Sequence, residues 1–269
     1  MRKMLLLVVA FFAMATTASA QFAQSNAGGQ GKGGNIFASM PTDGYNRVYF
    51  GYNPVIVAWN EGGALYNKMY PIKNGLTLGY LRGTNIVKSL PLFVEYGANL
   101  QWTFGRSRTD WDYTDLSTRF NMLSINVPVN VAFRFSFFND DFSVTPYLGL
   151  NMRFNVVGVT KHIYDDYAGG GEFDGFDADG TKLTIKYNMF SEEEEVEKVR
   201  DGVYKTGMGE GCAMKRFQIG FNCGVAFSYK EYTFGVGYVT DFNKILKADV
   251  DYPITARMGV TTISVGYNF

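Results

Sequence analysis

Residues 217–229 read FQIGFNCGVAFSY, and they alternate strictly between two kinds of side chain. The odd-numbered positions are all apolar, and the even-numbered positions are all small or polar. Successive side chains of a β-strand point to opposite faces, so this pattern predicts a strand with one apolar face and one small or polar face. The segment is also longer than the roughly 5–6 residues typical of strands in soluble sheets.

The same alternation recurs along the chain and predicts an all-β protein of eight strands. Residues 123–135 (LSINVPVNVAFRF) and 144–156 (VTPYLGLNMRFNV) repeat it most clearly. Most of the strands reach the roughly 9–11 residues that a tilted strand needs to cross a bilayer. The predicted strands cover approximately residues 47–59, 75–86, 89–104, 119–137, 142–160, 215–229, 232–242 and 256–269.

The polarity of the two faces favours a membrane barrel over a soluble sandwich. A soluble sheet turns its apolar face inward and leaves a charged, hydrated face outside. Here the second face consists of Gly, Ser, Asn, Thr and Ala with an occasional charge, which suits a narrow interior. The apolar face is continuous and aromatic at its ends, as a lipid-facing surface requires.

The connections between the strands alternate in length. Long connections are expected at residues 60–74, 105–118, 161–214 and 243–255, and short ones at 87–88, 139–141 and 230–231. An antiparallel up-and-down barrel has short turns at one end and long loops at the other. It must close, because an open edge in lipid leaves backbone groups without hydrogen bonds.

The N-terminus predicts export. Residues 1–20 contain two basic residues, a short apolar run and an Ala-Ser-Ala site, which is typical of a signal peptide cleaved after Ala20. Residues 21–46 are rich in Gly, Ser, Asn and Gln and predict a flexible segment before a barrel at 47–269. The balance of 25 basic and 25 acidic residues gives no reason to expect a nucleic-acid partner.

With its strand pattern, its loop alternation and its terminal SVGYNF, the chain resembles the small outer-membrane β-barrel proteins of Gram-negative bacteria. The size class is that of the OmpA membrane domain and OmpX. The resemblance implies a place in the cell outer membrane, contact with its lipid, and recognition of the last strand by the barrel-assembly machinery. Tyr267 and Phe269 match that assembly signal. The family includes structural proteins, adhesins, enzymes and narrow pores, so it implies no activity.

The inward face of the predicted barrel carries a polar network. An eight-stranded barrel is about wide enough for its own side chains to fill. Burying Glu95, Arg134 and Arg153 is costly unless they pair, so we expect a carboxylate–guanidinium contact inside the barrel. A narrow channel for ions or small solutes is the alternative to a filled lumen. The inward polar residues are Glu95, Asn99, Gln101, Asn126, Asn130, Arg134, Asn151, Arg153, Asn155, Gln218 and Asn222.

The sequence offers little support for catalysis, a metal or another cofactor. His162 is the only histidine; with Ser191 and Asp165 or Asp166 it is a poor candidate for a hydrolase at the rim, since no nucleophile elbow surrounds the serine. The acidic stretch 174–180 lacks the spacing of an EF-hand loop and is expected to be a solvated loop. We therefore predict a protein that is not an enzyme.

Two further expectations concern the region before and within the sixth strand. Cys212 and Cys223 are expected to be free thiols, because strand geometry separates them, with Cys223 facing lipid. The run Glu192–Glu195 is expected to be a hydrated cluster, on a short helix through Val199.

The connection 161–214 is the longest, and within it residues 181–190 alternate again. We expect this stretch to form a hairpin arm that extends the sheet beyond the membrane and offers an edge to an extracellular or envelope protein partner. The alternative is an added membrane strand, which gives a barrel of ten strands.

Overall fold

A computed structural model of the chain describes a set of β-strands and their connections, in residues 43–59, 71–87, 90–111, 114–138, 141–165, 183–190, 194–198, 214–246 and 255–269. The strands are β1 (Tyr45–Trp59), β2 (Asn74–Asn85), β3 (Leu92–Trp111), β4 (Thr114–Phe133), β5 (Phe135–Phe137), β6 (Phe142–Asp165), β7 (Leu183–Asn188), β8 (Glu194–Lys198), β9 (Phe217–Tyr229), β10 (Tyr232–Asp241) and β11 (Ala256–Asn268). Among these residues no helix is long and apolar enough to span a membrane.

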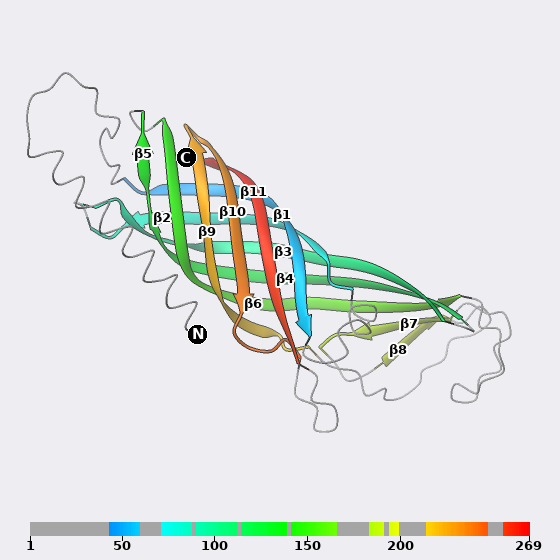
Figure 1. Cartoon of the computed structure of the whole chain (residues 1–269). Helices are drawn as coiled ribbons and strands as arrows, with labels where there is room; N and C mark the ends of the chain where they lie inside the picture. Colours follow the sequence, from blue (N-terminus) through cyan, green and yellow to red (C-terminus); the bar gives the residue numbers. More distant parts are fainter. Residues whose placement is uncertain are drawn as a thin grey trace, which may run out of the picture.

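The strands close into an antiparallel barrel (Figure 1). β1 pairs with both β2 and β11, which joins the first strand to the last. β4 pairs with β6, and β5 continues the line of β4 along the same neighbour. The closed ring therefore contains eight strands, namely β1, β2, β3, β4, β6, β9, β10 and β11, as predicted.

β7 and β8 lie outside that ring, so the alternative of ten membrane strands is wrong. β9 pairs with β6 only as far as Phe154, and β7 takes over along β6 from Val159 to Tyr164. Among the strands that the structure describes, β8 pairs with β7 alone. These two strands extend the sheet beyond the barrel wall (Figure 1).

The barrel has two unlike ends. One, the turn end, holds the short connections 86–91 and 230–231 and the C-terminus, where the backbones of Asn46 and Phe269 exchange hydrogen bonds of 3.2 and 2.9 Å. The other, the loop end, holds the projecting parts of β3, β4, β6, β7 and β8 (Figure 1).

Two predicted boundaries were wrong at the loop end. Residues 105–118 were expected to form a long loop, but β3 and β4 continue to pair as far as Trp111 and Thr114. Outward positions there change from apolar to charged, so the apolar alternation stops before the strands do. Similarly, Glu194–Lys198 forms a strand beside β7 and not the expected helix, because its backbone groups pair with that neighbour.

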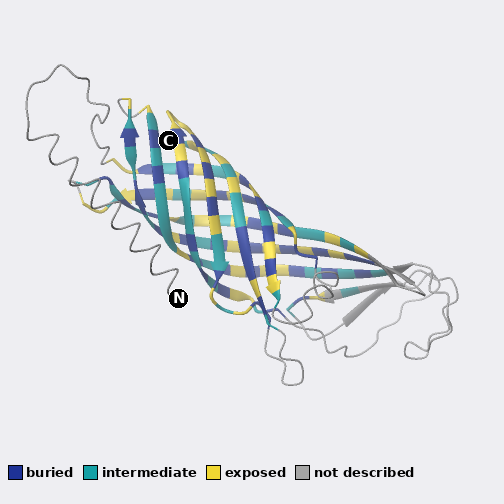
Figure 2. Ribbon diagram, viewed as in Figure 1, coloured by how far each residue is buried: buried dark blue, intermediate teal, exposed yellow. Residues whose placement is uncertain are grey.

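The two faces of the wall differ as the alternation predicted (Figure 2). Phe50, Leu78, Leu100 and Val265 point outward and are each at least half exposed. The inner face carries many glycines, and some are required by crowding. A Cβ atom at Gly79 would collide with the ring of Tyr49, which crosses the interior.

Candidate functional site

The lumen is the first candidate site, and its turn end is closed by a small cluster around Glu95. The hydroxyl of Tyr45 donates to Glu95 Oε1 at 2.5 Å, and Arg47 Nη1 lies 3.7 Å from the same oxygen. Tyr45, Phe93 and Ala132 pack together beside this carboxylate. Glu95 is fully buried, and these partners contact its carboxyl group.

Amide side chains fill the middle of the lumen. Asn126 Nδ2 donates to Asn99 Oδ1 at 2.8 Å and to Gln101 Oε1 at 3.0 Å. Asn222 Nδ2 donates to Asn130 Oδ1 at 2.9 Å, and Asn130 Nδ2 reaches Glu95 Oε2 at 3.4 Å. These bonds connect the inner faces of β3, β4 and β9.

The amide side chains line a cavity of about 80 Å³. A water molecule needs roughly 10–15 Å³ of such space and two to four polar partners, so this volume can hold a few waters. Its walls include the polar Arg47, Asn53 and Asn151 and the apolar Val239 and Val260. The middle of the lumen, which we call the polar chamber, is therefore large enough to hold water.

A second ion pair lies further toward the loop end. Arg153 Nη1 donates to Asp241 Oδ2 at 3.0 Å, and Arg153 Nε donates to Asn126 Oδ1 at 3.2 Å. Both charged side chains are buried. Asp241 Oδ1 accepts no hydrogen bond from a described residue. Beside this pair, Ser124 Oγ donates to Asn155 Oδ1 at 2.7 Å and Asn155 Nδ2 donates to Gln218 Oε1 at 2.6 Å.

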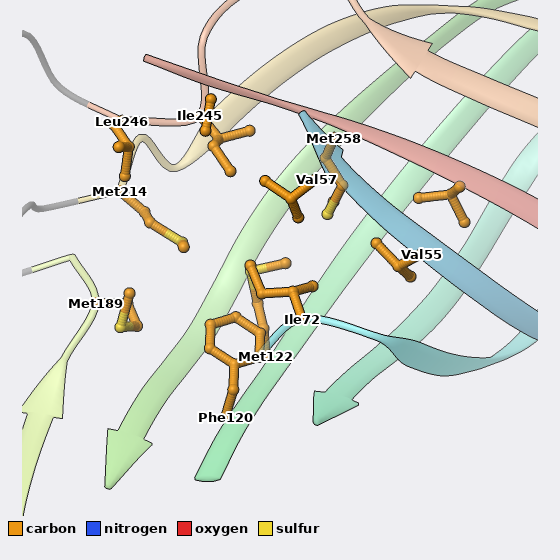
Figure 3. Close-up of a cluster of buried hydrophobic side chains, with 12 residues drawn as sticks. Val55, Val57, Ile72, Phe120, Met122, Met189, Met214, Ile245, Leu246 and Met258 are labelled. Atoms are coloured by element: carbon orange, nitrogen blue, oxygen red, sulfur yellow. The ribbon is translucent and has the colours of Figure 1, made fainter. Parts of the chain in front are cut away.

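An apolar cluster occupies the lumen beyond that pair (Figure 3). It combines inward side chains of β1, β4 and β11 with residues from the segments that follow or precede the strands. Those segments continue the wall, since Met189 N bonds to Gly158 O, Met214 N to Met189 O and Ile245 N to Ala256 O. The buried members are Val55, Val57, Ile72, Phe120, Met122, Met189, Met214, Ile245, Leu246, Ala256, Met258 and Val260.

Eight of the eleven inward polar residues predicted from the sequence fall into three groups. Asn99, Gln101, Asn126 and Arg153 form one hydrogen-bonded group. A second group contains Glu95, Asn130 and Asn222. Arg134 is half-buried at the turn end, with its guanidinium 5.6 Å from the ring centroid of Tyr45.

The charged partners of Glu95 and Arg153 were missed in the sequence. Arg47 and Asp241 each occupy an inward position by the alternation of their strands, so counting parity to the strand ends would have found them. Asn151, Asn155 and Gln218 were placed inward, and all three are buried.

The residues of the expected assembly signal lie at the turn end. Tyr267 is 47% exposed, Phe269 is 65% exposed, and the rings of Tyr267 and Tyr232 meet edge to face at 5.9 Å between centroids. Cys223 is a free, half-buried thiol on the apolar face, in register with Leu148 and Tyr238.

The projecting sheet at the loop end is the second candidate site, and its inner face holds the histidine. His162 is 5% exposed, and its Nδ1 lies 3.2 Å from Thr118 Oγ1. This position is beyond the apolar outer face of the barrel. Burial lowers the pKa of His162 to about 4, because it disfavours the charged imidazolium. A neutral, buried imidazole of this kind is a structural group, not one set to exchange protons near pH 7.

Several sequence expectations lie outside the described residues. They concern residues 1–20, most of 21–46, the acidic stretch 174–180, and the residues Asp166, Ser191 and Cys212. Tyr45 and Asn46, at the end of the expected flexible segment, belong to β1. Within the described part, no group of three or more His, Cys, Asp or Glu residues is placed to hold a metal ion.

Comparison with known proteins gives no family and no curated relative. Solved structures do match. One is Ail, the attachment invasion locus protein of Yersinia pestis, solved with the heparin analogue sucrose octasulfate: TM-score 0.35, 12% identity, covering 84% of this chain and 99% of Ail. Another is Neisserial surface protein A, with TM-score 0.34, 10% identity, 84% of this chain and 97% of that protein. The fold assignment rests on the strand pairings described above.

Proposed function

We propose that this protein is a non-enzymatic integral outer-membrane β-barrel with a lumen closed by its own side chains, and that its loop end presents a surface for structural or interaction roles. The observation that carries this proposal is the apolar cluster that fills the loop-end half of the lumen. The narrow channel for ions or small solutes is the alternative.

The outer surface supports the membrane location. A closed barrel leaves no strand edge unpaired within lipid, and the exposed apolar face continues around the wall. In this location the turn end faces the periplasm and the loop end faces outward. The outer-membrane lipid and the barrel-assembly machinery are then the general partners of the chain.

The contents of the lumen support closure. Buried charges are held in the pairs Arg47–Glu95 and Arg153–Asp241, which leaves no continuous row of one sign to attract an ion. A dry apolar constriction blocks ions because an ion would lose its hydration there without replacement. On this proposal the apolar cluster closes the polar chamber on the side of the loop end.

Swelling of liposomes tests the closed lumen. Liposomes that contain the folded protein should swell in arabinose no faster than empty liposomes, whereas a general porin should give rapid swelling in the same preparation. Swelling that grows with the amount of protein would support the narrow channel instead.

The second half of the proposal concerns the projecting sheet. β7 and β8 lengthen the sheet beyond the wall and end on an edge, and an exposed edge can accept a further strand from a partner. Native complexes isolated from outer membranes should lose their partners when residues 165–210 are deleted. If a folded deletion variant keeps every partner, the partners bind to the barrel wall or to residues 21–46 instead.

The C-terminal strand supports a role in assembly. We propose Tyr267 and Phe269 as the signal, because both aromatic side chains are exposed at the turn end, where β11 pairs with β1. Deletion of Phe269 should reduce the folded protein found in outer membranes much more than it lowers stability in micelles. Phe50→Ala, at another exposed aromatic position, serves as the control; normal insertion of the deletion variant would contradict the assignment.

A further inference from the structure

Four basic residues stand directly opposite one another across the projecting sheet. Arg106 on β3 is in register with Arg119 on β4, Arg119 with Lys161 on β6, and Lys161 with Lys186 on β7. Residues opposite each other in antiparallel strands point to the same face, with Cβ atoms about 4.5–5.5 Å apart. We call these four residues the basic row.

The basic row lies on the outer face of the sheet. Arg106 and Arg119 are exposed, and Lys161 and Lys186 are partly exposed. The residues that flank them on the other face, Phe120 on β4 and Thr160 on β6, are fully buried. Arg108 is exposed two residues beyond Arg106, and thus on the same face.

The basic row begins where the lipid-facing surface ends. On β3 the last outward apolar residue is Phe104, two positions before Arg106. On β6 the apolar Val159 lies two positions before Lys161, and Ile163 follows Lys161 on the same face. Two residues of a strand span about 7 Å. The polar headgroup layer on one side of a bilayer is roughly 5–8 Å thick. A barrel that spans the membrane therefore places the basic row at the headgroups.

The basic row aligns four cationic residues across four neighbouring strands. Phosphate groups suit this geometry, because Arg and Lys both bind phosphate oxygens through charge-assisted hydrogen bonds. A row about 5 Å in spacing can contact the phosphates of a single headgroup at more than one point.

The sequence positions beyond the basic row favour a partner on the membrane side. Asp110, Asp115 and Asp165 occupy the next aligned row of like residues toward the tip of the sheet. Glu195 of β8 is in register with Lys186, so the basic row ends at β7. A lipid headgroup reaches the basic row from the lipid-facing side of the wall, where Phe104 precedes Arg106 on β3.

From this placement we propose that the basic row binds the phosphate-bearing headgroups of the lipid leaflet into which the loop end projects. The inference rests on the proposed membrane location. It adds a specific lipid site to the outer wall, in Arg106, Arg119, Lys161 and Lys186, and it gives the projecting sheet a fixed height on the membrane surface.

The test uses the full chain folded in zwitterionic micelles and titrated with bisphosphorylated lipid A, with bound lipid counted by native mass spectrometry. The test variant is Arg119→Gln with Lys161→Gln, at the centre of the row. The control is Arg257→Gln with Lys244→Gln, which removes the same charge from two other exposed positions near the loop end. Each basic residue at an anionic surface is worth roughly fivefold in affinity, so the test variant should bind about 30-fold more weakly.

Thermal melting separates binding from a structural role. Without lipid A the test variant should melt at the same temperature as the native protein, because Arg119 is exposed and Lys161 is partly exposed on the outer face. With lipid A the native protein should gain more in melting temperature than the test variant. Equal losses of lipid A in test and control variants would overturn the proposal.

A titration with heparin tests whether the basic row binds a soluble polyanion instead of a lipid headgroup. Heparin, a soluble polyanion, should bind weakly and with no difference between native and test variant. Strong heparin binding that requires the basic row, without lipid A binding, would also overturn the proposal and favour an extracellular polysaccharide. Failure of the native chain to insert into liposomes would instead contradict the proposed membrane location.

Discussion

The two halves of the lumen are built from the same strands but filled in opposite ways. From Glu95 to Arg153 the interior consists of amides, hydroxyls and paired charges around a cavity of about 80 Å³. Toward the loop end, twelve buried apolar residues form a cluster, and four of them are methionine. The polar half has room for water, and we expect the apolar half to exclude it. Whether water can replace a lost side-chain partner therefore depends on which half of the lumen contains the substituted residue.

The difference arises from how each half is built. Residues of the wall alone fill the polar half, and their glycines leave room for long side chains such as Tyr49 and Tyr147. The apolar half also receives Ile72, Met214 and Leu246 from segments outside the barrel strands. Methionine is unbranched and fills irregular gaps, which suits a space bounded by several short segments.

The largest effect is expected at the border of the two halves. Asp241→Ala leaves the buried guanidinium of Arg153 without its carboxylate, which should cost about 3–5 kcal/mol of unfolding free energy. Urea unfolding in micelles measures it. Adding Arg153→Met should recover most of the loss, because the buried charge is then gone; a double variant as unstable as the single one would contradict this reading.

Truncation in the apolar half should cost somewhat less. Met258 is 1% exposed, so Met258→Ala removes buried methylene groups and leaves a cavity that water does not fill. The expected loss is about 3 kcal/mol in the same urea assay. Ile263→Ala, on the outward face of the same strand, is the matched control and should cost much less in a micelle. Equal losses would show that the apolar half is not dry.

Acid should destabilise the loop end through His162. Its pKa is lowered to about 4, so between pH 6.5 and 4 the unfolded chain takes up a proton that the folded chain does not. Stability is therefore full above pH 6.5 and is lost as pH falls, by roughly 2 kcal/mol from pH 7 to pH 5. NMR titration of this single imidazole checks the midpoint; a value near 6.5 would mean that the ring is solvated. His162→Gln should remove this part of the pH dependence.

The smallest effect is expected in the polar chamber. Asn222→Ala removes the hydrogen bond to Asn130, but Asn130 lines the cavity, and a water there can replace the lost donor. The expected cost is about 1 kcal/mol by urea unfolding. A loss as large as that of Met258→Ala would erase the distinction between the two halves.

The strand alternation was sufficient to predict the barrel, because every membrane-spanning strand has one lipid-facing side. The alternation failed to predict the strands where they extend beyond the lipid-facing surface. Outward positions such as Arg106 and Arg119 are charged beyond the lipid, so strands that continue there were taken for a loop. Pairing with a neighbouring strand, which the alternation cannot reveal, holds Glu194–Lys198 in a strand.

The polar half of the lumen could be anticipated from sequence, and the apolar half could not. Inward amides such as Asn126 and Asn130 stand out against an apolar outer face. At the loop end, Val55, Ile56 and Val57 are apolar on both faces of β1, so parity carries no signal. Ile245 and Leu246 lie in a segment expected to be a loop, and only the folded chain brings them to Met258.

Conductance across a planar bilayer tests the closed lumen most directly. The folded native protein, added at concentrations at which a general porin opens steadily, should give no sustained current at neutral pH, because the apolar half of the lumen offers an ion no hydration. Steady openings comparable to those of a general porin would contradict the account.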